Sequence, residues 1–177
     1  AATIGSNHNS RSNDGEIVAG RGFWPGLAVS LKHNSKFASF SLLSKGSYPA
    51  ELNVKIPFSL VINDEAEGTL KLLPGFWFMY NMYALARNSW KYGVRDNRCE
   101  KTQLLEFDYL APDTINETLK ALLLLEEWVG GSEKRSTKNE EIELGREILI
   151  NSDFDKTHRI YARGIESSKR PVEILKP

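Results

Sequence analysis

The sequence predicts a mixed β and α fold, in which a β-rich coil region precedes a helical region and a small C-terminal β hairpin. Apolar residues recur every six positions in the first third of the chain, then take helical spacing, and finally alternate as in short strands. We therefore divide the chain into a β-helical or β-rich coil region (1–70), a helical region (71–150) and a short β segment that packs on both (151–177).

Composition limits the classes of protein to consider. The 177 residues suffice for one domain or two small units. The formal net charge is zero and the pI is about 7.1, which argues against a general nucleic-acid binder. The chain contains one cysteine, so no disulfide can form within it, and we expect a reducing, cytoplasmic location. No apolar run reaches membrane-spanning length, so we expect no membrane partner.

The first 62 residues are rich in Gly, Ser, Asn and Lys, and their apolar residues follow a six-residue period. The members of this series are Ile17, Phe23 and Val29, and later Leu42, Tyr48, Val54 and Leu60. Such spacing is typical of a hexapeptide β-helix, in which each hexad forms one flat side of a triangular coil and its apolar residue points inward. An ordinary antiparallel sheet with loops is the alternative.

The stretch from Leu72 to Tyr109 predicts a helix rich in aromatic residues. Pro74 suits a first helical turn, and the residues that follow at helical spacing are Phe76, Tyr80, Tyr83, Arg87, Trp90 and Val94. Trp77, Phe78 and Met82 fill the other sides, so the first two turns are apolar nearly all round and we expect them to be buried. Farther along, cations three or four residues apart form a basic stripe, which either meets a ligand or pairs with carboxylates on a solvated face.

Two further helices are expected after this stretch. Thr114 and Glu117 match a capping box, so we expect a helix to begin there. Gly130 and Gly131 are expected to end it. A third helix is predicted over residues 140–150.

Near the end of the chain, residues 159–166 and 171–177 alternate like two short strands. We expect them to pair as a hairpin or to cover a sheet edge.

The segment from Thr3 to Asn53 resembles the last coils of a left-handed β-helix. With the block PGFWFMYNMYALARNSWKYG, it resembles a family of large bacterial hexapeptide-transferase-like proteins whose activity is uncharacterised. The resemblance implies a left-handed β-helix followed by helices. By analogy with other hexapeptide proteins it implies acyl transfer from acyl-CoA, as a co-substrate and not a tightly bound cofactor, to a hydroxyl or amine of a small molecule. The same analogy implies a homo-oligomer, with a trimer as the expected assembly.

His33 and His8 are the candidate catalytic residues. Both occur in the local sequence His-Asn-Ser followed by a basic residue. A histidine can act as a general base near neutral pH, and the resemblance implies that a coil histidine removes the proton from the acceptor. The alternative is an Asn/His/Ser turn whose side chains bond their own backbone.

A phosphate-bearing acyl donor requires cations and, for its base or sugar, an aromatic surface. The candidates on the coil are Arg21, Lys32, Lys36 and Trp24. Trp24 lies at an expected turn, where it either stacks on the donor or packs against a neighbouring coil or subunit. We expect no metal site, because Cys99 has no Cys or His near it in sequence and the histidines lack ligand spacing.

Two functions of different classes therefore remain open. The first is an acyltransferase of the hexapeptide-repeat type, or the C-terminal part of one. The second is a non-catalytic cap or oligomerisation segment that closes a β-helix, since an open solenoid end exposes core and unpaired strand edges.

Overall fold

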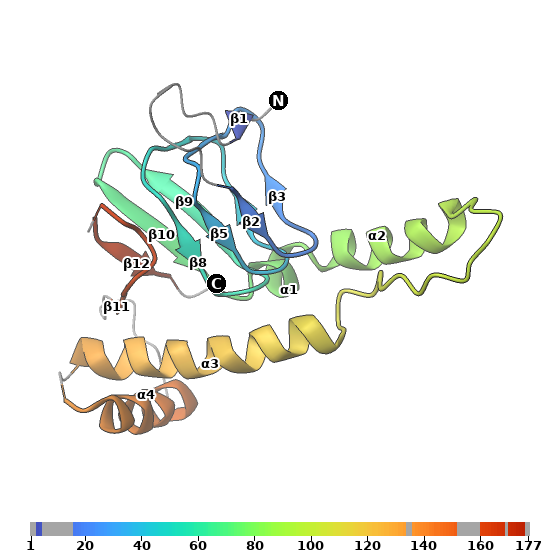
Figure 1. Ribbon diagram of the computed structural model, residues 1–177. Helices are drawn as coiled ribbons and strands as arrows, with labels where there is room; N and C mark the ends of the chain where they lie inside the picture. Colours follow the sequence, from blue (N-terminus) through green and yellow to red (C-terminus); the bar gives the residue numbers. More distant parts are fainter. Residues whose placement is uncertain (1–2, 5–15, 134–135, 152–159, 169, 176–177) are drawn as a thin grey trace.

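The computed structural model describes residues 3–4, 16–133, 136–151, 160–168 and 170–175. These residues form a mixed β and α fold with several sheets and four helices. Figure 1 shows the sheets wound together as a coil, with α3 (Pro112–Glu133) beneath them and α4 (Lys138–Asn151) below α3. The short helix α1 (Phe76–Tyr80) leads into α2 (Met82–Arg95), which extends away from the sheets.

Between Val18 and Val61 the chain passes through three parallel sheets in turn. The first contains β1 (Thr3–Ile4), β4 (Ser30–Leu31) and β7 (Ser47–Tyr48), and the second contains β2 (Val18–Ala19), β5 (Lys36–Phe37) and β8 (Asn53–Val54). The third begins with β3 (Trp24–Pro25), β6 (Leu42–Leu43) and β9 (Leu60–Asp64). Within this range each sheet is revisited after 17 or 18 residues, as the pairings Ser30–Ser47 and Leu42–Leu60 show. The antiparallel alternative is therefore wrong for this region.

Residues with positive φ also recur every six positions along the coil. They are Gly22, Ala28, Asn34, Phe40, Gly46 and, after one omission, Phe58. Gly22 and Phe40 occupy the same corner one turn apart, and a Cβ on Gly22 would overlap the Phe40 ring. The Phe40 ring in turn stacks on that of Phe58, with centroids 4.9 Å apart.

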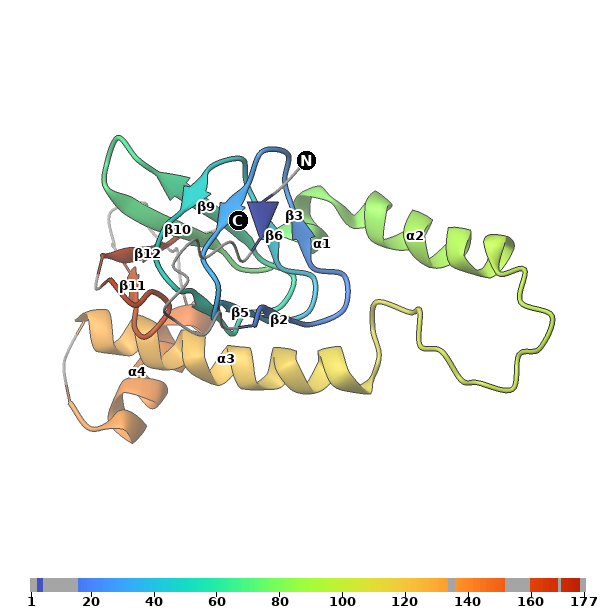
Figure 2. The ribbon, with the colours of Figure 1, turned by 45° about the horizontal axis from the view of Figure 1, so that its top comes forward.

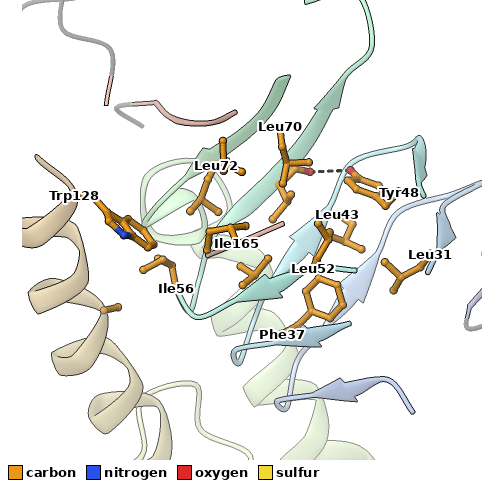
Figure 3. Packing of buried hydrophobic residues seen from close by; sticks show 14 of the residues in the cluster. Leu31, Phe37, Leu43, Tyr48, Leu52, Ile56, Leu70, Leu72, Trp128 and Ile165 are labelled. Carbon is orange, nitrogen blue, oxygen red and sulfur yellow. Dashed lines mark hydrogen bonds between the residues drawn. The ribbon is translucent and has the colours of Figure 1, made fainter. Parts of the chain in front are cut away.

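The inward register differs from the predicted one by a single residue in part of the coil. Tyr48 is buried, as the hexad spacing predicts, but Leu42 and Leu60 are only half-buried. Their neighbours Leu43 and Val61 are fully buried in the interior (Figure 3 labels Leu43). Because successive residues of a strand point to opposite faces, the prediction that Leu42 and Leu60 point inward is wrong.

The third sheet changes direction after β9. Strand β10 (Thr69–Leu73) pairs with β9 antiparallel, and β12 (Val172–Ile174) pairs with β10 parallel, joining Val172 to Leu70. Strand β11 (Ile160–Ala162) pairs antiparallel with β12, so the predicted C-terminal hairpin is confirmed.

The predicted buried aromatic helix is largely wrong. The helix is interrupted at Asn81, and only Trp77 in α1 and Leu85 in α2 are buried. Tyr83 and Trp90 are 77% and 66% exposed. The difference in burial comes from tertiary packing: α1 packs on the outer face of the third sheet, whereas α2 extends away from it (Figure 2).

The predicted capping box at the start of α3 is also wrong. The Glu117 carboxylate accepts a hydrogen bond from the backbone N–H of Ser39, at 2.8 Å, instead of turning back to its own helix. The Thr114 hydroxyl accepts from the N–H of Ala111 at 3.0 Å. The helix therefore begins at Pro112, and Glu117 joins it to the coil.

The glycines expected to end this helix lie inside it. A Cβ on Gly130 would overlap the carbonyl group of Glu141 in α4, and a Cβ on Gly145 would overlap the carbonyl group of Glu126 in α3. These glycines let the backbones of α3 and α4 approach closely, and α3 continues to Glu133. The third predicted helix, over residues 140–150, is confirmed as α4.

Candidate functional site

The end of the coil is closed at the last strand of each parallel sheet. Strand β9 pairs with β10. Beside β8, the N–H of Asn53 donates to the carbonyl oxygen of Ile165 at 2.7 Å. Beside β7, the Nδ2 of Asn63 donates to the carbonyl oxygen of Ser47 at 2.7 Å. Each last strand therefore has a partner, which an unprotected solenoid end lacks.

The apolar interior is completed by side chains from beyond the last turn. Leu70 and Leu72 of β10, Ile165 and Trp128 of α3 are all buried in the same cluster as the coil interior. Figure 3 shows Trp128, Leu72 and Ile165 around Ile56, at the side of the cluster away from Leu31, and Leu70 beside Tyr48. The residues that cover the strand edges thus also cover the core.

His33 lies in the coil interior at the corner between β4 and β5. It is only 5% exposed, and its Nδ1 has no hydrogen-bond partner among the described residues. The neighbouring Ser35 hydroxyl donates to the carbonyl oxygen of Lys32 at 2.7 Å, which is the turn-forming role that the alternative interpretation gave to this motif. His8 lies outside the described residues.

Arg21 joins the coil to the start of α3. Its Nε donates to Asp113 Oδ2 at 2.7 Å, and its other nitrogens donate to the carbonyl oxygens of Asp108 and Tyr109. The guanidinium also lies over the Phe40 ring, 5.5 Å from its centroid. The hydrogen bond from Arg21 lowers the pKa of Asp113. These contacts occupy the donors that were predicted to hold a phosphate.

Trp24 and Lys32 lie on different parts of the coil. The Trp24 ring is half-exposed on β3 and its centroid is 5.9 Å from that of Trp77 in α1. Lys32 is half-buried and follows β4. Arg21, Trp24, Lys32 and Lys36 therefore do not converge on one site.

Lys36 lines a cleft of about 540 Å³ between the second sheet and helices α3 and α4. The cleft has three further lysines, Lys55 on the coil, Lys120 on α3 and Lys138 on α4. Half of its lining residues are apolar, namely Val18, Phe37, Ala38, Val54, Leu123, Leu124 and Ile142. Sequence spacing could not reveal this set, because its members come from separate elements.

Positive charge exceeds negative charge in this cleft. Two glutamates line it. Glu127 pairs with Lys138 at 2.9 Å, and Glu117 accepts the Ser39 N–H at 2.8 Å. Within the described part of the chain, the ammonium groups of Lys36, Lys55 and Lys120 form no ion pair with a carboxylate.

Helix α2 presents a second feature, of which the sequence predicted the basic stripe but not the exposed apolar side. Tyr83, Trp90 and Val94 are exposed on one side of it. The adjacent side carries Arg87, Lys91 and Arg95, and desolvation followed by the charges of the two arginines lowers the pKa of Lys91. The carboxylates of the described residues leave these three cations unpaired, whereas Arg98 Nε pairs with Asp96 Oδ1 at 2.8 Å.

The described residues lack two other kinds of feature. They contain no group of three or more His, Cys, Asp or Glu side chains that could hold a metal ion. None of their helices combines the length and the apolar character needed to cross a membrane.

Comparisons with known proteins give one informative relative. No protein-family profile matches the sequence, and no solved structure matches it. A protein of Treponema pallidum (strain Nichols), described as uncharacterised, is 48% identical over 181 residues that cover 99% of this chain. The chain spans about a quarter of the length of that relative, 24%.

Proposed function

We propose that this chain forms the last turns of a left-handed β-helix and closes its end. The parallel sheets, the 17- and 18-residue turns and the positive φ at every sixth residue support a coil built from hexads. The observation that carries the capping function is that β7, β8 and β9 each have a partner at the same end of the coil.

A closed end matters because a solenoid buries its core only between neighbouring turns. Without β10, Ile165 and α3, the last turn would expose Leu52, Val54 and Val61 together with strand edges. Such an end would pair with another chain. The cap therefore stabilises the last turn and prevents end-to-end association.

Light scattering on the Ile165→Asp variant tests this function. Ile165 is buried and its segment covers β8, so an aspartate there should open the cap and cause association that increases with protein concentration. Tyr161→Asp, at an exposed position on β11, is the matched control and should scatter like the wild type. A folded Ile165→Asp variant that stays monodisperse at all concentrations would contradict the capping function.

We also propose that the exposed side of α2 contacts a second copy of the chain, in a homo-oligomer. Ile115, Leu119 and Leu122 form another exposed apolar stripe, on the N-terminal half of α3. The stripes on α2 and α3 are both exposed, so they do not cover each other within one chain, and α2 extends away from α3 in Figures 1 and 2. If α2 of each copy contacts α3 of the next copy in one direction around the assembly, the contact is heterologous. Such contacts form a closed ring, such as a trimer, when the rotation between copies closes.

The second candidate function is acyl transfer by a longer protein of which this chain would form the C-terminal part. The observation that favours it is His33, whose Nδ1 has no partner among the described residues and is therefore available to accept a proton. The donor would be acyl-CoA, held by Lys32 and Lys36, two of the predicted coil cations, which form no ion pair within the described residues. The acceptor would be a hydroxyl or amine of a small molecule.

Calorimetry with acetyl-CoA tests this candidate on the chain and on the longer protein. Donor binding that His33→Ala and His8→Ala retain, together with turnover that one of them abolishes, would support acyl transfer. Absence of binding to both proteins would exclude it and leave the capping function unaffected.

A further inference from the structure

We propose that the lysine-lined cleft between the second sheet and helices α3 and α4 binds a single-chain anionic amphiphile. The ligand is a small molecule with an alkyl chain and a phosphate or carboxylate head. Fatty acids, alkyl phosphates and long-chain acyl-CoA share this chemistry. The inference goes beyond the capping function and does not depend on it, because the cleft lies on the side of the coil and not at its end.

The apolar part of the ligand is indicated by exposed apolar side chains inside the cleft. Val18 on the sheet side is 53% exposed and Leu123 on the α3 side is 49% exposed, although both line the same cleft. Leu124 and Ile142 extend this surface. Large apolar side chains that face one another across a gap gain free energy when an alkyl chain displaces water between them.

The anionic head is indicated by the charge of the lining. The cleft carries four lysines against two glutamates, in a chain whose formal net charge is zero. One glutamate is neutralised by Lys138, and the other is held by the Ser39 N–H. Lys36 on β5, Lys55 just after β8 and Lys120 on α3 therefore remain to meet an anion from both walls.

The volume fits one small molecule. About 540 Å³ lies within the range of roughly 300–1,000 Å³ that ligand pockets of proteins show. Three elements of the wall are fixed to one another, because Glu117 joins α3 to the coil and α4 packs closely on α3 through Gly130 and Gly145. The two walls are thus held in place around the cleft.

Calorimetry with decyl phosphate, below its critical micelle concentration, is the direct test. We expect saturable binding that weakens as salt is added, because exposed charges are screened. Octyl phosphate should bind about fifteenfold more weakly, since it lacks two methylenes and each buried methylene contributes about fourfold. Inorganic phosphate and decyltrimethylammonium, which keep only the head charge or only the chain, should bind far more weakly. The affinities of decanoate and decanoyl-CoA, measured in the same way, show whether the natural ligand is a fatty acid, an alkyl phosphate or an acyl-CoA.

The variants Lys36→Gln and Lys120→Gln should each weaken the binding of decyl phosphate about threefold to fivefold, as expected for the loss of one exposed ion pair. Lys45→Gln is the matched control, because Lys45 is an exposed lysine of the coil that does not line the cleft. Circular dichroism verifies that the variants are folded. Equal loss in the Lys45→Gln control, equal affinity for decyltrimethylammonium, or no saturable binding of decyl phosphate would each overturn the proposal.

Discussion

Arg21 on the coil donates from Nε to Asp113 Oδ2 at 2.7 Å, and so connects two residues that are 92 positions apart. The same guanidinium donates to the carbonyl oxygens of the chain just before α3 and lies over the Phe40 ring. One side chain thus orients α3 against the coil, and the position of α3 determines one wall of the cleft.

Arg21→Gln should destabilise the protein by about 1–2 kcal/mol. A hydrogen bond to a charged group contributes about 1.5–3 kcal/mol, and the half-exposed Asp113 reduces this through solvent screening. Arg21→Lys should recover only part of the loss, because an ammonium group cannot reach all of these acceptors. Urea denaturation measures both. Stability equal to the wild type in Arg21→Gln would show that this residue is not an anchor.

Gly145→Ala should destabilise the α3–α4 pair by about 3 kcal/mol, because its Cβ would overlap the backbone of Glu126. Gly93→Ala is the matched control in another helix. A Cβ on Gly93 meets no atom within 4 Å, so this substitution should stabilise the protein by about 0.5–1 kcal/mol. Thermal denaturation of the two variants should therefore give shifts of opposite sign. A Gly145→Ala variant as stable as the wild type would refute the close helix approach.

The pH dependence of stability should report on the β9–β10 hairpin. Lys71 Nζ lies 2.7 Å from Asp64 Oδ2, and this hydrogen bond lowers the pKa of Asp64 below its ordinary value of 3.8. A carboxyl with a lowered folded-state pKa stabilises the protein above its ordinary pKa, and this contribution is lost as the pH falls through the folded-state value.

The stability difference between the wild type and Asp64→Asn should therefore be largest near neutral pH and should shrink as the pH falls below about 4. Urea denaturation at several pH values between about 2 and 7 measures it. A difference that stays constant over this range would show that the charge of Asp64 does not contribute.

Variants of the two exposed helix faces test the contact between copies. Trp90→Glu and Leu119→Glu should each shift the protein from oligomer to monomer, because each removes an apolar anchor from one side of the same contact. Sedimentation should show a dimer when the two variants are mixed, since each retains the face that the other has lost. A mixture that remains monomeric would contradict a heterologous contact.

The hexad spacing predicted the coil region because apolar residues at a fixed period already specify which side of a strand is buried. Tyr48 and Val54 follow this rule. Leu42 and Leu60 do not, because they lie on the outer face of the third sheet, where Leu42 packs against the cluster that contains Trp77 of α1. A sequence period cannot distinguish an interior from an outer face that another element covers.

The helical region was less predictable because its exposure depends on tertiary contacts. The aromatic side chains of α2 have the spacing of a buried helix, yet Tyr83 and Trp90 are mostly exposed. The glycine pair of α3 has the sequence pattern of a helix end, but Gly130 instead lets the backbone of α3 approach that of α4 closely. Likewise, the cleft joins lysines from the coil, α3 and α4, which no local motif connects.

Hydrogen exchange followed by mass spectrometry measures whether the C-terminal elements close the end of the coil. In a solenoid each turn contacts only its neighbours, so the loss of the cap should destabilise the nearest turn most. In Ile165→Asp we expect amide exchange to increase most in β8 and β9, less in β5 and β6, and least in β2 and β3, with Tyr161→Asp unchanged. An equal increase through all of these strands, or one confined to β11 and β12, would contradict this closure of the coil.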